Sequence, residues 1–348
     1  MTRVSDFDYH LPPGLIAQAP LPQRDASRMM VVHRPSGEME DRCFRDFPSF
    51  LDRGDVVVVN DSRVIPARLE ARRETGARIE VLLLRRPDGE GITDEGEVWE
   101  CLLKPARRLR EGERLTFGAG AEGRILERLS DKKWRLGIAT DRPLATFLEE
   151  RGLPPLPPYI KRKGASGKEE DLVRYQTVYA RRPGSVAAPT AGLHFSPAVL
   201  QEIAARNVPV VSVTLHVGYG TFSPIEVEEI EDHVMDAEPF EMPTAAAERI
   251  NAARRVVAVG TTSCRVLETA ADERGHIEAR SGVTSLYIFP GYRFKRVGAL
   301  LTNFHLPRSS LYLLVCAFAG KELMEKAYRR AVEKRYRFYS YGDCMLIL

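Results

Sequence analysis

The spacing of apolar and polar positions separates two kinds of segment along the chain. Residues 50–66 contain the run VVVV and then the polar turn NDSR, which is too short and too β-branched for a helix and predicts a buried strand. Over 67–152, short β-type runs such as ARIEVLLLRR and KWRLGIA alternate with turn signals such as DG and GAG. Several short strands at this spacing predict a small antiparallel β-barrel or sandwich, and we expect the barrel.

A different pattern, strand then turn then helix, follows a Pro/Gly-rich linker at 152–168. Thr244 is expected to be the N-cap of one helix, Gly275 to lie near the C-terminal end of the next, and Ser309 or Ser310 to cap a third. The helices are expected over 197–207, 244–255, the residues after 260, the residues after 310, and 321–336.

Alternating strands and helices are typical of layered α/β folds. The N-terminal part of the chain also supplies strands, MMVVHR and DVVVVN, that need a sheet to join. We therefore predict one α/β domain that is discontinuous in sequence, formed by 1–66 and 153–348, with 67–152 inserted as the antiparallel β-barrel.

Composition indicates a globular protein, because 44% of the 348 residues are hydrophobic and 28% are charged. The longest strongly apolar stretch, 311–320, is about half of the roughly 20 residues that span a bilayer. The N-terminus lacks the apolar core of a signal peptide, so we expect a cytoplasmic protein without a membrane partner. Five scattered cysteines, with no CxxC or paired Cys/His spacing, argue against a disulfide framework or a structural zinc site.

The formal net charge of +3 does not by itself indicate a nucleic-acid binder. Two local runs are more informative: KRK at 161–163, and 321–337 with seven Lys or Arg against three Glu. Either run is suited to phosphate contacts, and the second is equally typical of a solvated helix face.

Each apolar run of the α/β part leads into a short segment rich in Gly, Thr, Ser, Asn, His and Arg. In open α/β sheets, ligands bind outside the carboxyl ends of the strands. Convergence there would build a pocket containing His194, His216 and His305. The segments are 60–63, 189–195 after an expected strand at 185–188, 216–222, 260–265 and 302–310.

Each of these features has a structural alternative. A single histidine is more often structural than catalytic, the glycines can serve turn geometry alone, and GTTS can simply begin its helix. It is the recurrence of the pattern in five segments that favours a site. No hydrolase elbow, nucleotide loop or dinucleotide fingerprint is present, and no two of the three histidines have metal-ligand spacing.

Several longer motifs are similar to those of one family. The stretches VVVVNDSRVIPARL, PGSVAAPTAGLHF, VTLHVGYGTFSPI, VGTTSCRVLE and TNFHLPRSSL resemble the S-adenosylmethionine:tRNA ribosyltransferase-isomerase (QueA) family of queuosine biosynthesis, and the resemblance extends from residue 6 to residue 348. The chain departs from the family pattern at Asp236, where a histidine is usual, at Val283, where a tryptophan is usual, and at Cys264.

The resemblance implies a reaction in which the ribosyl part of S-adenosylmethionine moves to a 7-aminomethyl-7-deazaguanine base at the tRNA wobble position. Epoxyqueuosine forms, and adenine and methionine leave. The proposed family mechanism starts with removal of the C5′ proton beside the sulfonium, so it needs a base and then an acid for adenine departure. Histidine suits both tasks, and which histidine performs which step stays open.

The expected participants follow from this resemblance. S-adenosylmethionine is a consumed co-substrate, so no cofactor and no metal are expected; the macromolecular partner is tRNA, bound by a monomer. His194, His216 and His305 are the expected catalytic residues. The expected substrate-binding residues are Asn60, Asp61, Arg63, Thr190, Gly192, Gly218, Gly220, Thr221, Thr261, Thr262, Arg265 and Asn303, and the expected tRNA-binding residues are Lys161, Arg162, Lys163, Arg293 and Lys295.

Two other functions stay open from the residues alone. An S-adenosylmethionine-dependent tRNA methyltransferase would need a Gly-rich strand-to-helix loop, which is not visible. A non-catalytic RNA-binding protein would use the barrel as its platform. Within the favoured interpretation, Ala191 and Gly192 are expected to leave space for substrate beside His194, and the predicted tRNA-binding cations are expected to be exposed.

Overall fold

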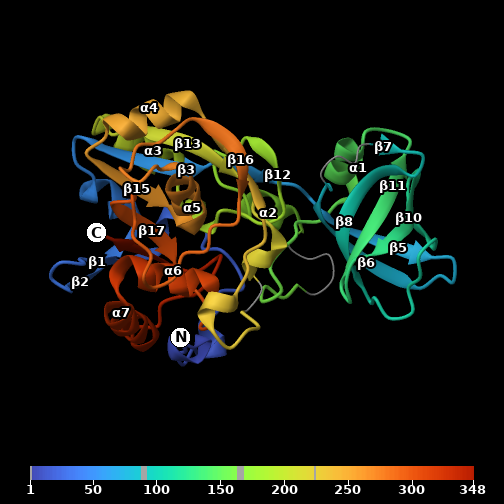
Figure 1. Ribbon diagram of the computed structural model, residues 1–348, viewed down its shortest axis with the longest axis horizontal. Coiled ribbons are helices and arrows are strands. Elements are labelled where there is room, and N and C mark those ends of the chain that lie inside the picture. Colours follow the sequence, from blue (N-terminus) through green and yellow to red (C-terminus); the bar gives the residue numbers. More distant parts are fainter. Residues whose placement is uncertain (1, 88–91, 163–167, 223–224) are drawn as a thin grey trace.

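The computed structural model describes residues 2–87, 92–162, 168–222 and 225–348. Its long axis separates a large α/β domain from a β-barrel (Figure 1). The predicted fold class, an α/β domain that is discontinuous in sequence and carries an inserted antiparallel barrel, is confirmed.

Nine strands in the described part of the chain form the mixed sheet of the large domain, in the order β16-β14-β13-β3-β15-β17-β18-β1-β2. The four central strands, β13, β3, β15 and β17, are parallel to one another. The strands are β1 (Arg28–Val32), β2 (Met39–Cys43), β3 (Asp55–Asn60), β13 (Val210–Leu215), β14 (Glu238–Met242), β15 (Arg255–Val259), β16 (Arg280–Thr284), β17 (Ala299–Asn303) and β18 (Cys344–Ile347).

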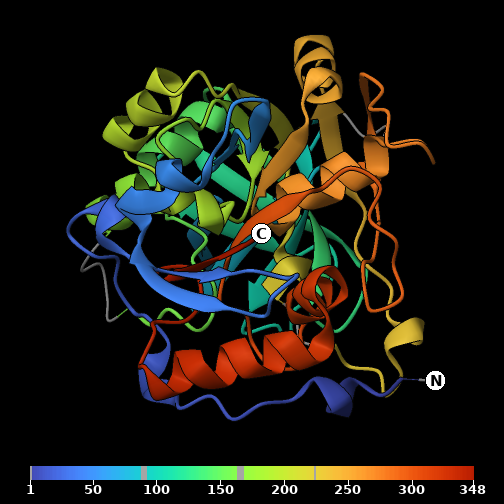
Figure 2. The ribbon, with the colours of Figure 1, turned by 90° about the vertical axis from the view of Figure 1, so that its left-hand side faces the viewer.

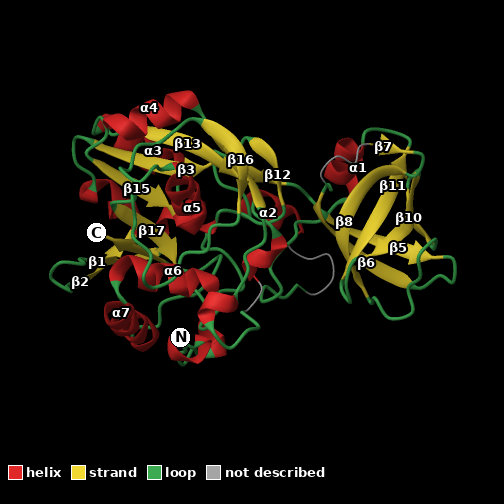
Figure 3. Ribbon diagram, viewed as in Figure 1, coloured by secondary structure: helices red, strands yellow, loops and turns green. Residues whose placement is uncertain are grey.

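Helices cover both faces of this sheet, as Figure 3 shows. The run VVVV contributes to the cores on both faces, because side chains alternate along a strand. Val56 and Val58 join the core on one face, and Val57 and Val59 join the core on the other. The first face packs against α4 (Thr244–Ala252), α5 (Gly260–Ala270), α6 (Ser310–Ala319) and α7 (Lys321–Glu333), and the second against α3 (Pro197–Ala205) and the 3₁₀ helix Phe44–Phe50.

The barrel closes because β11 pairs with both β10 and β8, which returns the sheet to its start. Its core contains both tryptophans of the chain, Trp99 and Trp134. Closure leaves no long unpaired edge on the described part of this domain. The elements are β5 (Arg68–Arg73), β6 (Arg78–Arg85), β7 (Ile92–Thr93), β8 (Gly96–Lys104), β9 (Arg114–Gly118), β10 (Ala121–Arg128), β11 (Lys133–Thr140) and α1 (Leu144–Arg151).

The two domains contact each other through a few residues of the large one. Val186 is buried within the barrel core, and Tyr219 packs against it. Lys133 of the barrel lies 3.9 Å from a carboxylate oxygen of Asp236. A short parallel pair, β4 (Ser62–Val64) with β12 (Arg182–Ser185), lies where the chain leaves and re-enters the large domain.

Of the two helix N-caps expected from the sequence, the one at Ser309 is confirmed and the one at Thr244 is not. Ser196 and Ser309 are N-caps, and each hydroxyl accepts the backbone N–H three residues on, at 3.3 and 3.2 Å. Thr244 was expected to cap α4, and this is wrong. The extended residue before the helix is Pro243, so Thr244 is already its first helical residue and its side chain makes no cap.

Two further expectations are corrected. The expected strand over 185–188 is not formed: Ser185 ends β12, and the three residues that follow lie outside any strand. Gly275 does not end α5, which stops at Ala270. Instead Gly275 has a φ of +79° and closes a turn, with its N–H donating to the Asp272 carbonyl at 3.0 Å.

Across the described residues, no helix combines the length and the apolar character needed to cross a membrane.

Candidate active site

The carboxyl ends of the four parallel strands meet at one edge of the sheet (Figure 1). Asn60 ends β3, His216 follows β13, Gly260 follows β15 and begins α5, and Asn303 ends β17. Four of the five predicted segments therefore start at the same edge. The fifth, 189–195, reaches this edge through the contacts of its histidine and threonine with Asn303.

His194 lies at the centre of a buried hydrogen-bond network. The Asn303 side-chain oxygen accepts from the Thr190 hydroxyl at 3.0 Å, so the Asn303 amide nitrogen points at His194 Nε2, 3.2 Å away. An amide nitrogen can only donate, which makes Nε2 the acceptor and leaves the proton on Nδ1. Nδ1 then donates to the Ser27 hydroxyl at 2.6 Å. Both ring nitrogens are therefore hydrogen-bonded, one as donor and one as acceptor, as in a neutral imidazole.

Burial lowers the pKa of His194 from 6.5 to about 3, and the charges of Arg337 and Arg24 act in the same direction. The imidazole is therefore neutral at pH 7. A histidine with this pKa is a weak base, and its protonated form would be a strong acid.

The space expected next to Ala191 and Gly192 is filled by protein. Gly192 lies so close to Tyr179 that a Cβ added to it would meet the Tyr179 hydroxyl at 2.1 Å. Ala191 packs in the hydrophobic core on this face of the sheet. His194 itself is only 4% exposed. The small residues thus permit close packing of the 3₁₀ helix Thr190–His194, and the expectation of substrate space at this point is corrected.

His305 is also buried, and its Nε2 is hydrogen-bonded. Its Nε2 lies 2.7 Å from the Thr302 hydroxyl, its backbone N–H donates to the Tyr328 hydroxyl at 3.1 Å, and its carbonyl accepts from the Tyr9 hydroxyl. Burial lowers its pKa to about 3. The structure shows a neutral histidine that ties the loop after β17 to α7 and to the N-terminal segment.

His216 differs from the other two histidines. Its ring is half-buried, and its side chain forms no hydrogen bond with any described residue; its buried Nδ1 has no partner there. The backbone of Gly184 lies against the ring, since a Cβ at that position would meet Nδ1 at 2.7 Å. Burial lowers the pKa of His216, and the negative charge of Asp61 opposes this shift.

Asp61 is itself buried beside His216. One carboxylate oxygen accepts from the Thr214 hydroxyl at 2.7 Å, and the other accepts from Arg181 at 3.2 Å. Arg181 is exposed, so the pair reaches the surface. The carboxylate thus has a fixed orientation next to the histidine.

Two predicted binding residues lie outside this hydrogen-bond network. The Asn60 side chain bonds to both the N–H and the carbonyl of Leu215 at 3.0 Å, which locks β3 to β13. Its role in the structure is therefore to join two strands. Arg63 lies on β4 with an exposed side chain.

Arg265, on α5, forms a buried ion pair with Glu238 on β14. Its Nε donates to the Leu286 carbonyl at 2.9 Å, and its Nη2 is buried without a partner among the described residues. Glu238 also accepts the N–H of Gly218 at 2.7 Å. The ion pair therefore fixes the loop that begins at His216.

The first turn of α5 is equally enclosed. Thr261 and Thr262 are buried, and the Thr262 hydroxyl has no partner among the described residues.

In the loop after β13, Gly220 lies against Asp236, since a Cβ there would meet that carboxylate at 2.1 Å. Thr221 lies in the 3₁₀ helix Tyr219–Phe222, and its side chain lies outside the described atoms.

Some of the cations predicted to bind tRNA are exposed at the surface, and others form ion pairs with acidic side chains. Lys161 and Arg293 are exposed. Arg162, however, forms two 2.7 Å hydrogen bonds to the buried carboxylate of Asp171, and its side chain is only 22% exposed. The expectation of an exposed Arg162 is corrected, because this guanidinium joins the linker to α2 (Lys168–Arg174).

Lys295 is likewise less exposed than expected. Its ammonium lies 3.1 Å from Glu273, donates to the Ala271 carbonyl at 3.3 Å, and its side chain is 25% exposed. Lys163 lies outside the described residues.

Four site residues were not predicted from sequence. Ser27, Arg24 and Arg337 surround His194, and Glu238 holds Arg265. Glu238 lies in the stretch HVMDAE, two residues after Asp236. The other three lie far from His194 in sequence, and no local pattern connects them. In the part of the chain that the structure describes, no group of three or more His, Cys, Asp or Glu side chains could hold a metal ion.

The family model described as "Queuosine biosynthesis protein" matches residues 4–347. The chain belongs to this family. The resemblance inferred from the motifs is therefore confirmed. An S-adenosylmethionine:tRNA ribosyltransferase-isomerase of Syntrophus aciditrophicus is 52% identical over 362 residues, covering 100% of this chain and 100% of that protein.

A protein of the same description from Moorella thermoacetica is 52% identical, with 99% of this chain and 100% of that protein covered. Among solved structures, the crystal structure of an S-adenosylmethionine tRNA ribosyltransferase from Thermotoga maritima is 37% identical and covers 99% of this chain and 100% of its own, with a TM-score of 0.54. The similarity extends over both domains.

Proposed function

We propose that this chain is an S-adenosylmethionine-dependent tRNA ribosyltransferase-isomerase. It transfers the ribosyl part of S-adenosylmethionine to the 7-aminomethyl-7-deazaguanine at the tRNA wobble position and isomerises it to epoxyqueuosine, with release of adenine and methionine. Full-length family membership and the names of relatives about half identical to it support this reaction.

One observation supports the placement of the chemistry: His216 is half-buried at the carboxyl end of β13, and its ring makes no hydrogen bond to a described residue. It can take up a proton without breaking an internal contact. His194 would have to give up a hydrogen bond to do so, because both of its ring nitrogens are engaged, and His305 lies in the interior with its Nε2 beside the Thr302 hydroxyl. His216 therefore removes the C5′ proton beside the sulfonium, and Asp61 stabilises the imidazolium that forms.

Two buried polar groups nearby are suited to bind the substrate. The free Nη2 of Arg265 and the hydroxyl of Thr262 lack partners among the described residues, and such groups cost about 1–3 kcal/mol each when left unsatisfied. They receive polar groups of the S-adenosylmethionine. His194 and His305 remain neutral and hold the loops that follow the strands.

The proposal is tested by incubating the protein with S-adenosylmethionine and tRNA that carries the deazaguanine precursor. Stoichiometric adenine release and epoxyqueuosine in the digested tRNA are expected. Formation of S-adenosylhomocysteine would instead identify a methyltransferase, and tRNA binding without either product would identify an RNA-binding protein.

A further inference from the structure

His194 also lines a narrow surface pocket with a cavity volume of about 20 Å³. Ser27, Arg24 and Arg174 line it together with His194. Residues 340–342 are also part of the lining. The sequence motifs pointed to the histidine alone, so the two arginines are new members of this region.

Both arginines carry charge that no carboxylate balances within the described structure. Arg24 donates to the carbonyls of Leu193 and Val173, at 3.2 and 2.9 Å. Arg174 donates to two carbonyls of the segment 21–22, at 2.6 and 3.1 Å. Burial and the neighbouring charge of Arg174 lower the pKa of Arg24. Two close cations without an anion favour an oxyanion between them.

Arg337 adds a third cation at this point. Its Nη1 is buried without a partner in the described part of the chain, and its charge acts on His194 together with that of Arg24. The nearest acid, Asp343, accepts the backbone N–H groups of Arg337 and Arg28 at 2.8 and 2.9 Å. Its two oxygens are therefore already occupied by backbone donors.

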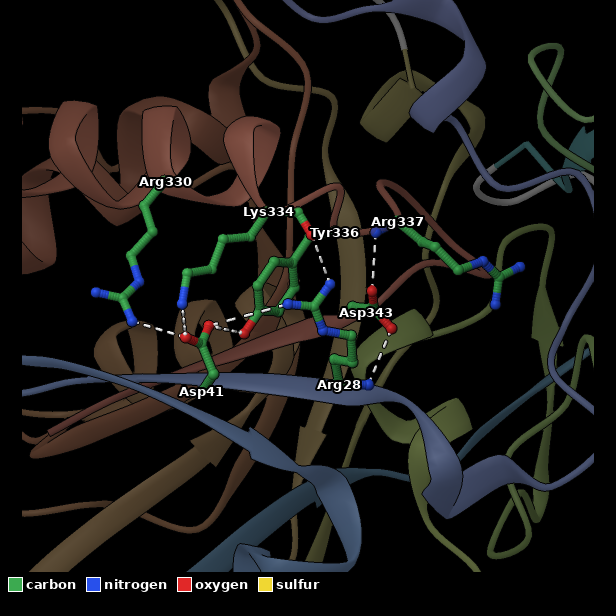
Figure 4. Close-up of polar contacts among 7 residues, drawn as sticks. All are labelled: Arg28, Asp41, Arg330, Lys334, Tyr336, Arg337 and Asp343. Carbon is green, nitrogen blue, oxygen red and sulfur yellow. Dashed lines mark hydrogen bonds and ion pairs between the residues drawn. The ribbon is translucent and has the colours of Figure 1, made fainter.

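From Arg337 the positive charge continues along the surface, where Arg28, Lys334 and Arg330 follow in a row (Figure 4). All three surround a single acid, Asp41, and their side chains are 41%, 46% and 33% exposed. Hydrogen bonds from Lys334, Tyr336 and Arg330 keep the pKa of Asp41 low although its burial opposes this, so the acid stays charged. Three cations around one anion leave an excess of positive charge.

We propose that the Arg24–Arg174 pocket receives an oxygen of a tRNA backbone phosphate, and that Arg28, Arg330 and Lys334 contact phosphates further along the strand. This inference rests on the proposed function. A carboxylate of S-adenosylmethionine offers the same oxyanion chemistry to the pocket. It is a single group, however, and would leave the exposed row of cations without a partner, whereas a polyanion engages both.

The surface row is tested with the double variant Arg330→Gln/Lys334→Gln. Its affinity for tRNA is measured across a range of salt concentrations, and thermal unfolding checks that it folds. The slope of log K against log salt is expected to fall by about one for each phosphate that the variant no longer neutralises. The matched control is Arg249→Gln/Arg254→Gln, which removes two exposed cations, one on α4 and one just after it, away from α7 (Figure 1). Equal slopes for both double variants and wild type would overturn this part of the inference.

The pocket is tested with Arg174→Gln, and with Arg174→Lys as the variant that keeps the charge. KM for tRNA is expected to rise about tenfold in Arg174→Gln and to recover partly in Arg174→Lys, with KM for S-adenosylmethionine unchanged. A rise in KM for S-adenosylmethionine alone would assign the pocket to its carboxylate, and no change in either would leave it without an anion; both results overturn the inference. Adenine release by the wild-type protein is measured first, so that failure of the proposed function is seen separately.

Discussion

At the scale of single residues, the three predicted catalytic histidines differ in what their ring nitrogens contact. His194 and His305 are held by hydrogen bonds in the interior, whereas the ring of His216 has no such partner among the described residues. Proton transfer needs a nitrogen that is free to change its state, which favours His216 over the two buried rings.

His216→Gln is therefore expected to lower kcat by roughly 10²–10⁴-fold, because glutamine cannot accept the proton. KM for both substrates should change little, and the melting temperature should stay close to that of wild type, since the ring bonds to no described residue. Single-turnover adenine release measures the effect. His276→Gln, at an exposed histidine, is the control. A near-normal rate for His216→Gln would remove this residue from the chemistry.

The two buried histidines predict how stability depends on pH. Their pKa in the folded protein is about 3, against about 6.5 in an unfolded chain. Between these values the unfolded state binds more protons, so the free energy of unfolding falls as the pH is lowered through this window. The decrease is up to about 1.4 kcal/mol per pH unit for each histidine.

Denaturant unfolding of wild type and of His305→Gln between pH 7 and pH 5 measures this dependence. The variant is expected to be less stable at pH 7 but to lose less stability on acidification, because one of the two groups is gone. Parallel curves for the two proteins would show that His305 does not titrate as its burial requires.

At the scale of elements, α5 and β14 are joined by the buried Arg265–Glu238 pair, which also holds the loop after β13 through Gly218. Removing one partner of a buried ion pair leaves an unbalanced charge, which costs about 3–5 kcal/mol. Glu238→Gln should lower the free energy of unfolding by this amount. The control on the same strand is Glu241→Gln, whose partner Arg182 is 55% exposed and whose removal should cost under about 1 kcal/mol. Similar decreases for both variants would contradict the argument.

Elements with local signals were predictable from the sequence, and contacts between distant segments were not. A serine followed by an amphipathic run marks the start of α3, and β-branched runs between turn residues mark the barrel strands, because both signals lie within a few residues. The prediction for Thr244 was wrong because the helix begins one residue earlier than expected, directly after the extended Pro243. The pairing of Arg162 with Asp171 and the contact of His194 with Ser27 depend on how segments pack, which no local pattern contains.

At the scale of the whole molecule, the barrel and the α/β domain have separate hydrophobic cores, connected where Val186 enters the barrel. Figure 2, turned by 90° from Figure 1, shows α7 and the N-terminal segment side by side on the large domain. The predicted site and the row of cations belong to that domain, and the site loop after β13 meets the barrel where Tyr219 packs against its core.

The two tryptophans make this separation measurable. Both lie in the barrel core, so their fluorescence reports unfolding of the barrel, whereas the helical circular dichroism signal comes mainly from the large domain, which carries α2 to α7. Val186→Ala removes two methyl groups from a side chain that is 1% exposed, at a cost of about 1–3 kcal/mol. The fluorescence transition should shift to lower denaturant, and the dichroism transition should move much less. Equal shifts of both transitions would mean that the two cores unfold as one cooperative unit.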